Sequence, residues 1–206
     1  DMKNWDPNQI GRKIGYLGQD VELLPGTIRD NIARLDPNPD SDAVLQAAQK
    51  AQVHELIQQL PGGYDTLVGP GGVALSGGQK QRIGLARAFY GNPCIVVLDE
   101  PNANLDEDGE VALHKAILAA GQSGVTVVVI TQRKQVLGAV DKILRLHQGT
   151  VDFFGTKEEF VKALQGLQAR KRQHAQKASS TVSKGQSNPP VSRPAPATPV
   201  LQRGEK

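Results

Sequence analysis

Two adjacent acidic residues follow an apolar run near the middle of this 206-residue chain. Residues 95–98 are apolar and rich in β-branched types, and Asp99 and Glu100 come directly after them. Such a run is typical of a strand in a parallel sheet, and the carboxyl ends of such strands face the ligand-binding crevice of open α/β sheets. Asp99 is suited to hold Mg²⁺, and Glu100 to orient a water molecule that attacks a phosphate. Two solvated acids at a strand end are the competing interpretation.

A serine and two glycines form a second candidate site at Ser76, Gly77 and Gly78, directly before Gln79. A helix that begins here leaves backbone N–H groups available, and its dipole favours an anion. Glycine also lets the backbone approach a phosphate closely. The competing interpretation is an ordinary N-cap by Ser76 behind a flexible loop, and the segment alone favours neither.

The elements that must position these residues alternate between strand and helix. Apolar runs predict buried strands at 94–98 and 125–130 and a short strand at 14–17, and Cys94 is expected in the core. Alternating strands and helices predict an α/β fold with a parallel sheet, into which a helical subdomain is inserted. The expected helices are 27–33, 41–51, 54–59, 80–90, 107–120 and 157–167, and a hairpin is expected at 142–146 and 150–153.

Three motifs taken together resemble the ABC ATPase family. Residues 75–82 read Leu-Ser-Gly-Gly-Gln-Lys-Gln-Arg, like the family's signature, and residues 95–101 read Ile-Val-Val-Leu-Asp-Glu-Pro, like its Walker B motif with the catalytic glutamate. Asn-Leu-Asp at 104–106 matches the D-loop, and Gly-Tyr-Leu-Gly-Gln at 15–19 resembles the Q-loop. The resemblance covers residues 10–165 and implies a partial P-loop NTPase core.

Further segments narrow the resemblance to exporters. Residues 19–33 look like the exporter-type stretch after the Q-loop, and residues 100–106 and 137–141 are similar to the ATPase half of type I secretion permeases. This resemblance implies a region that couples ATP hydrolysis to protein secretion at the cytoplasmic face of the inner membrane. It also implies six upstream membrane helices on the same chain, and membrane-fusion and outer-membrane proteins as partners.

The resemblance implies that two such domains, as a homodimer, sandwich two Mg²⁺-bound ATP molecules head to tail. Glu100 is then catalytic, while Asp99 and Gln19 contact Mg²⁺, and Gln19 also links the site to the membrane domain. Asp106 couples the two sites across the dimer. The residues expected to contact the γ-phosphate of the partner's ATP are Ser76, Gly77, Gly78 and Gln79.

Two departures from the family pattern stand out. The chain contains no Gly-x-x-x-x-Gly-Lys-Ser/Thr loop, which supplies the amide cradle and lysine for ATP phosphates. The chain begins at Asp1, so we expect a truncation that removed this loop, or its loss, and an inactive fragment. Gln132 stands where the family has a catalytic histidine; glutamine donates a hydrogen bond but carries no positive charge, so slow hydrolysis is expected.

Charge is distributed unevenly along the chain. The formal net charge is +3, yet residues 170–206 hold eight Lys/Arg and one acid. This tail, rich in Pro and Ser, is expected to be disordered, as a solvated linker or a contact to anionic lipid. It has no aromatic residues, so no nucleic-acid partner is expected. The expected division is 1–20 (end of the N-terminal core), 21–91 (helical subdomain), 92–168 (C-terminal core) and 169–206 (tail).

Two other functions compete with the exporter ATPase. The first is a non-catalytic remnant that uses the signature to pair with an intact ABC ATPase domain. The second is a lobe of a DNA-repair or chromosome ATPase, which shares the signature and Walker B motifs. The exporter-like stretch at 19–33 disfavours the second alternative.

Overall fold

A computed structural model describes residues 5–166 of the chain. The chain divides into two compact units, residues 1–157 and 158–206. The described part of the second unit belongs to a helix that spans 157–166, close to the expected one. The tail for which disorder was predicted lies outside the described residues.

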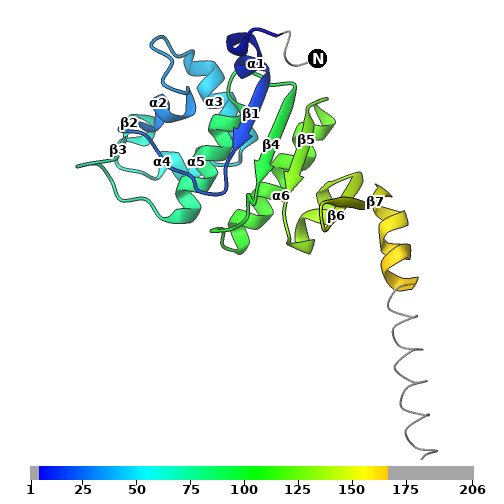
Figure 1. Ribbon diagram of the computed structural model, residues 1–206. Helices are drawn as coiled ribbons and strands as arrows, with labels where there is room; N and C mark the ends of the chain where they lie inside the picture. Colours follow the sequence, from blue (N-terminus) through cyan, green and yellow to red (C-terminus); the bar gives the residue numbers. More distant parts are fainter. Residues whose placement is uncertain (1–4, 167–206) are drawn as a thin grey trace, which may run out of the picture. The chain divides into compact units, whose positions relative to one another are not determined.

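A three-stranded parallel sheet lies at the centre of the first unit, in the order β1-β4-β5 (Figure 1). The strands are β1 (Ile14–Leu17), β4 (Ile95–Asp99) and β5 (Thr126–Ile130), so the three strand predictions are confirmed to within a residue. In the register, Leu17 is opposite Leu98 and Asp99 is opposite Ile130. The carboxyl ends of all three strands therefore share one edge of the sheet.

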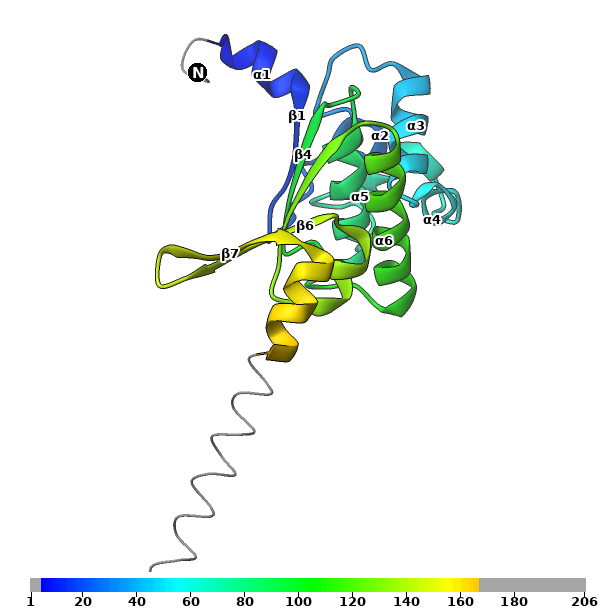
Figure 2. The same ribbon diagram turned by 90° about the vertical axis from the view of Figure 1, so that its right-hand side faces the viewer.

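Helices α5 (Gly77–Phe89) and α6 (Glu107–Gln122) pack on the same face of this sheet, as the view in Figure 2 shows. The side chains that point toward them, such as Leu98, are fully buried. On the opposite face, Tyr16 is 60% exposed and Ile130 is 51% exposed. The expectation that β4 and β5 are buried on both faces is therefore wrong, because both helices cover the same side.

Cys94 is exposed, which corrects its expected place in the core. The residue precedes β4 rather than lying in it: its amide donates to the carbonyl of Lys13 at 2.9 Å, and its Sγ lies 3.4 Å from the same oxygen. Lys13 ends helix α1 (Pro7–Lys13), an element that the sequence pattern did not predict.

Between β1 and α5 the chain forms three short helices and a small antiparallel pair. Thr27 and Asp30 form a reciprocal capping box at the start of α2, in which each side chain accepts the other residue's amide. Asp40 caps α3, directly before residue 41, where the helix was expected to begin. The helices are α2 (Ile28–Ile32), α3 (Ser41–Lys50) and α4 (His54–Gln58). The strand β2 (Gly26–Thr27) pairs with β3 (Leu67–Val68), and the 3-10 turn η2 (Gly63–Asp65) precedes β3.

Arg34 fixes α5 to its surroundings from the C-terminal end. Its guanidinium donates to the carbonyls of Arg87 (3.1 Å), Ala88 (3.2 Å) and Gly11 (2.8 Å). A cation next to the last carbonyls of a helix complements the helix dipole. Burial lowers the pKa of Arg34 and also that of Arg87. The residues that begin α5 are thus carried by a helix whose far end is firmly held.

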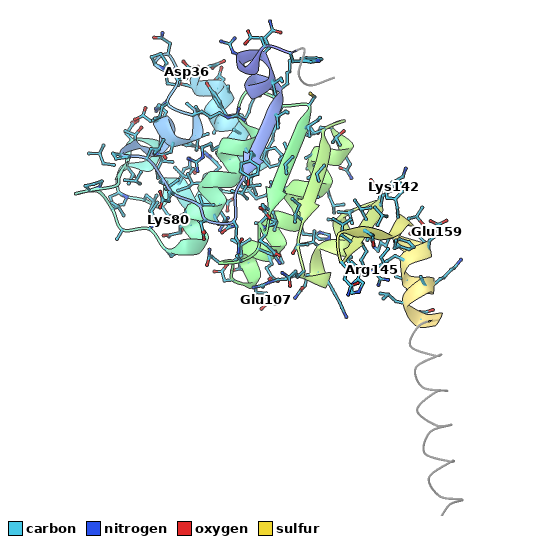
Figure 3. All side chains as sticks on the ribbon, viewed as in Figure 1. Asp36, Lys80, Glu107, Lys142, Arg145 and Glu159 are labelled. Carbon is cyan, nitrogen blue, oxygen red and sulfur yellow. The ribbon has the colours of Figure 1, made fainter. Side chains whose placement is uncertain are left out.

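The expected hairpin is confirmed and extends beyond its predicted ends. It comprises β6 (Lys142–His147) and β7 (Thr150–Thr156), and it follows η3 (Lys134–Ala139). Figure 3 shows Lys142 and Arg145 on this hairpin; Lys142 lies over the ring of Phe154, and Arg145 pairs with Asp152. Within residues 5–166, no helix has the length and apolar character needed to cross a membrane.

Candidate functional site

The shared edge of the sheet brings together residues from three separate parts of the sequence. Asp99 ends β4 and Glu100 follows it, while Gln132 lies two residues past the end of β5. Gln19 lies two residues past the end of β1, the other neighbour of β4. Ligands of open α/β sheets bind at this edge. The topology thus groups the residues that the sequence analysis selected from separate motifs.

The backbone at Glu100 takes a conformation that is uncommon for a non-glycine residue, with φ at 43°. Its amide donates to the carbonyl of Ile130 at 2.8 Å, one step beyond the β4–β5 pairing. A left-handed conformation costs an L-residue about 1–2 kcal/mol. Strain of this kind collects at functional sites, where the surrounding structure enforces it.

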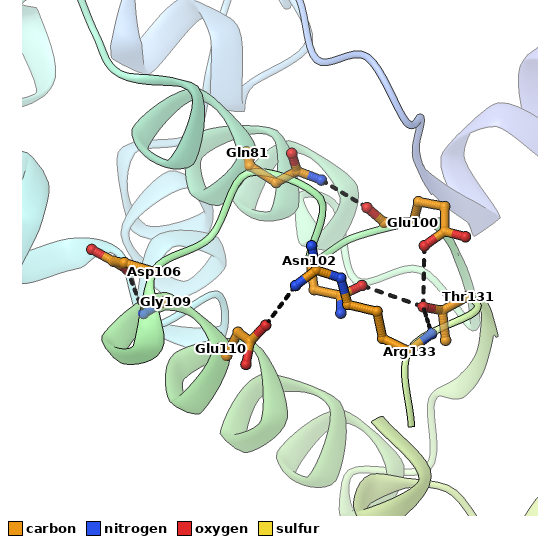
Figure 4. Close-up of polar contacts among 8 residues, drawn as sticks. All are labelled: Gln81, Glu100, Asn102, Asp106, Gly109, Glu110, Thr131 and Arg133. Carbon is orange, nitrogen blue, oxygen red and sulfur yellow. Dashed lines mark hydrogen bonds and ion pairs between the residues drawn. The ribbon is translucent and has the colours of Figure 1, made fainter. Parts of the chain in front are cut away.

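The carboxylate of Glu100 is held by the segment after β5 (Figure 4). Oε1 accepts the amide of Gln132 at 3.2 Å, and Oε2 lies 3.1 Å from the hydroxyl oxygen of Thr131. The carboxylate therefore has a defined direction although the residue is only half-buried. A fixed carboxylate at this edge can accept a hydrogen bond from a water molecule and orient it.

Gln81 connects the helix of the signature motif to the same site. This side chain is buried, and its Nε2 donates to the carbonyl of Glu100 at 3.3 Å. Its Oε1 accepts from Nδ2 of Asn104 at 3.2 Å. One buried amide thus joins α5, the residue after β4 and the predicted D-loop.

Ser76 caps α5 through a reciprocal capping box with Gln79. The amide of Ser76 lies 2.9 Å from Oε1 of Gln79, and the amide of Gln79 lies 3.2 Å from the Ser76 hydroxyl. Both residues therefore have structural partners, as the N-cap interpretation expects. In the described structure the amides of Gly77 and Gly78 have no such partner, so they remain available to an anion.

Gly78 also packs tightly against the predicted D-loop. A Cβ at this position would lie 2.9 Å from the backbone carbonyl oxygen of Asn104. Any larger residue would therefore separate the two segments. The start of α5 and the D-loop are held in contact by the absence of a side chain here.

Asp106 is the N-cap of α6, and its Oδ1 accepts the amide of Gly109 at 2.9 Å. Gln19 is exposed and Asp99 is half-buried, and neither side chain hydrogen-bonds within the described range. The structure thus gives Asp106 a local structural role and leaves Gln19 and Asp99 available to a ligand.

The site suits a metal ion that arrives with its own ligands. Across residues 5–166, no three His, Cys, Asp or Glu side chains cluster closely enough to hold a metal. Mg²⁺ commonly binds through one or two carboxylates together with substrate phosphates and water. Asp99, whose carboxylate is not engaged, fits such a role beside the oriented Glu100.

Four residues of this network were not singled out from the sequence. Asn102 and Gln81 are buried polar residues, each 1% exposed, and Thr131 and Asn104 contact them directly. Gln81 and Asn104 lie inside the quoted motifs, so their position was an available signal. The signal for Thr131 was weaker: it is a polar residue that directly follows β5, one of the strands that end at the shared edge.

Comparison with known proteins agrees with the family resemblance drawn from the sequence motifs. The sequence model of the family described as "ABC transporter" matches residues 1–103. The chain is 46% identical over 176 residues to the type I secretion system ATP-binding protein PrsD of Rhizobium meliloti, covering 85% of this chain and 30% of that protein. It is 38% identical over 167 residues to the exotoxin translocation ATP-binding protein PaxB of Pasteurella aerogenes, covering 81% and 23%.

A third relative is less specific in its name. The uncharacterized ABC transporter ATP-binding protein YfiB of Bacillus subtilis is 43% identical over 152 residues, covering 74% of this chain and 26% of that protein. The chain thus spans less than a third of the length of each of these relatives.

Proposed function

Because this chain belongs to the ABC transporter family, we propose that it forms part of the ATP-hydrolysing module of an exporter that secretes proteins by the type I route. The observation that carries this proposal is the direction of the Glu100 carboxylate, which the amide of Gln132 fixes at the edge of the sheet beside Asp99. The relatives whose names refer to type I secretion and exotoxin translocation support the exporter class.

In the proposed reaction, water attacks the γ-phosphorus of ATP in line and ADP leaves. Glu100 accepts a hydrogen bond from that water and orients it. Asp99 and Gln19 hold the Mg²⁺ that accompanies the nucleotide. Phosphoryl transfer of this kind depends on positioning and charge stabilisation, so the fixed direction of Glu100 is the chain's main contribution.

The signature segment acts on a second nucleotide in this proposal. The available amides of Gly77 and Gly78, at the positive end of the α5 dipole, bind the γ-phosphate of ATP held by a partner domain. Ser76 and Gln79 contact the same phosphate. Asp106, next to the segment packed against Gly78, couples the two sites of a homodimer.

The wider assembly follows from the exporter class. We propose a six-helix membrane domain on the same polypeptide, with membrane-fusion and outer-membrane proteins as further partners. The module then works at the cytoplasmic face of the inner membrane. Gln19, exposed and two residues past β1, is the proposed link to the membrane domain.

A chimera tests the hydrolytic role. Residues 5–166 replace the aligned segment of the Rhizobium meliloti relative, which supplies the rest of the protein. We expect the chimera to hydrolyse ATP and Glu100→Gln to abolish turnover while Mg-ATP still binds. The matched control is Glu107→Gln, an exposed carboxylate in the first turn of α6. Undiminished hydrolysis in Glu100→Gln would refute the proposed role of Glu100.

The 206-residue chain by itself is expected not to bind ATP at micromolar nucleotide. It contains no Gly-x-x-x-x-Gly-Lys-Ser/Thr loop. It therefore lacks the backbone amides and the lysine that would hold the phosphates of a bound ATP. Titration calorimetry with Mg-ATP checks this directly. Tight binding to the isolated chain would contradict the expectation.

A second candidate function is pairing without catalysis. Two observations favour it. The helix that begins at the signature motif is well capped, and the sequence contains no phosphate-binding loop. In that role the chain completes the site of an intact ABC ATPase domain and holds no ATP itself. The test mixes this chain with an intact domain whose own signature serine is replaced by arginine. Restored hydrolysis supports pairing in trans, and no restoration counts against it.

A further inference from the structure

Thr131 lies at the centre of the polar contacts around Glu100 (Figure 4). Its hydroxyl oxygen is 3.1 Å from Oε2 of Glu100 and 3.3 Å from Oδ1 of Asn102. The same oxygen accepts the amide of Arg133 at 3.1 Å. A hydroxyl that accepts one hydrogen bond retains its single proton for donation. Between the two oxygen acceptors, the charged carboxylate makes the stronger bond.

Asn102 offers the Thr131 hydroxyl a competing acceptor on the buried side. Its side chain is 1% exposed, and its Nδ2 has no partner within the described part of the chain. Asn102 also lines a cavity of about 30 Å³ together with Glu110, His114 and Gln135.

We propose that Thr131 is a positioning residue for the Glu100 carboxylate, to which its hydroxyl donates. The inference rests on the proposed hydrolytic function, because it assigns how the water-orienting carboxylate is aimed. Glu100 is then held at both oxygens by consecutive residues: by the amide of Gln132 at Oε1 and by Thr131 at Oε2.

The backbone contacts of Glu100 do not by themselves aim its carboxylate. With φ at 43°, its carbonyl is tied to Gln81 and its amide to Ile130. These contacts fix the main chain but leave the side-chain torsions free. The two contacts at the carboxylate oxygens are therefore what selects one direction for the group that meets the water.

A turn-forming role is the simpler alternative for Thr131. The bond from the Arg133 amide to its hydroxyl is of the kind that threonine makes in local turns. That role uses only a lone pair of the oxygen. It would be retained by serine and lost in valine, just as positioning would, so the two roles must be separated at Glu100 itself.

The activity test uses the chimera described above. Thr131→Val removes the hydroxyl at nearly constant shape, and we expect kcat to fall roughly ten- to a hundredfold while KM for Mg-ATP stays nearly unchanged. Thr131→Ser restores kcat. The matched control is Thr126→Val, the same substitution at the exposed opposite end of β5. Unchanged kcat in Thr131→Val, or a change confined to KM, would overturn the proposal.

A second measurement is independent of hydrolysis and uses the 206-residue chain. The amide proton of Gln132 reports on the Glu100 carboxylate, and Glu100→Ala defines its chemical shift and exchange rate without that acceptor. Positioning predicts that Thr131→Val moves this amide most of the way toward the Glu100→Ala values, while Asn102→Leu, which removes only the competing acceptor, leaves it close to the wild-type values. Thr131→Ser and Thr126→Val leave it unchanged.

The two measurements separate the two hypotheses. If the parent chimera hydrolyses no ATP, the proposed function fails, and the Gln132 amide still decides whether Thr131 positions Glu100. If Thr131→Val leaves that amide at its wild-type values, the positioning role is refuted whether or not the chimera is active. The amide of Arg133 reports the turn: a loss there with no change at Gln132 assigns Thr131 to the turn alone and also refutes the proposal.

Discussion

The main chain of Gln132 binds the carboxylate of Glu100, since the amide of the first lies 3.2 Å from Oε1 of the second. The side chain of Gln132 is exposed and does not take part in this contact. Any residue except proline can supply the amide. The identity of residue 132 therefore alters what the site offers a nucleotide without altering how Glu100 is held.

Replacing Gln132 by histidine is expected to raise turnover. Histidine can carry a positive charge next to a phosphate, whereas glutamine offers only a neutral amide. In the chimera we expect kcat to increase about tenfold, because a single well-placed donor at such a site is worth at least that much. Steady-state kinetics measure the change, with Gln135→His as the control. An unchanged kcat would remove the reason for regarding Gln132 as a weak point of the site.

Replacing Ser76 by aspartate separates its two roles. Aspartate is a good N-cap and suits the positive end of a helix dipole, so the melting temperature of the chain should change little. Its negative charge would repel a phosphate, and trans complementation or chimera hydrolysis should fall by at least tenfold. Ser76→Ala is the companion variant, expected to lower stability by about 1 kcal/mol through loss of the cap. Retained hydrolysis in Ser76→Asp would show that no phosphate meets this residue.

Replacing Gly15 by alanine is expected to destabilise the fold strongly. A Cβ on Gly15 would lie 2.0 Å from the backbone oxygen of Ala88, so β1 and α5 would have to move apart. We expect a loss of about 1–3 kcal/mol or more in the free energy of unfolding. Gly11→Ala is the control, because nothing lies within 4 Å of its added Cβ. Urea denaturation of the two variants measures the difference, and equal stabilities would contradict the packing described for β1.

Asp30 is expected to make stability depend on acid. Hydrogen bonds from the backbone and side chain of Thr27 lower the pKa of Asp30 below its ordinary value of 3.8. The stabilisation is therefore complete above pH 3.8 and is lost as the pH falls through the lower, folded-state pKa. Asp30→Asn should reduce the melting temperature at neutral pH, and the difference from wild type should shrink in strong acid. A difference that is constant with pH would show that the carboxylate charge is not involved.

Much of the fold could be predicted because its signals are local. The run at 95–98 and the Ser76 cap each specify one element, and the order of motifs specifies how β4 and α5 follow one another. The burial of β5 could not be predicted in this way. An apolar run such as 125–130 shows that the strand has two apolar faces, but which of them a helix covers is decided by the path of the chain between strands.

The same distinction between local and tertiary signals applies to the residues of the candidate site. Asp99, Glu100 and Ser76 were found because unusual residue types follow a recognisable pattern. Thr131 was not found, because a threonine that follows a strand is common in sequence and acquires a role here only through the 3.1 Å between its hydroxyl oxygen and Oε2 of Glu100. Such contacts belong to tertiary structure, and residues about thirty positions apart carry no local sign of them.

Two features of the sheet affect how this chain behaves once it is made. One is the exposed apolar face that carries Tyr16 and Ile130. The other is the outer edge of β5, which pairs with no strand in the described sheet, so its amides and carbonyls can pair with another chain. Purified alone, this polypeptide should self-associate in a concentration-dependent way and bind dyes that report exposed apolar surface. Covering that face, through added sequence or a stabilising fusion, should yield a monodisperse sample, and a lysine at Val128 offers a one-residue route to the same end.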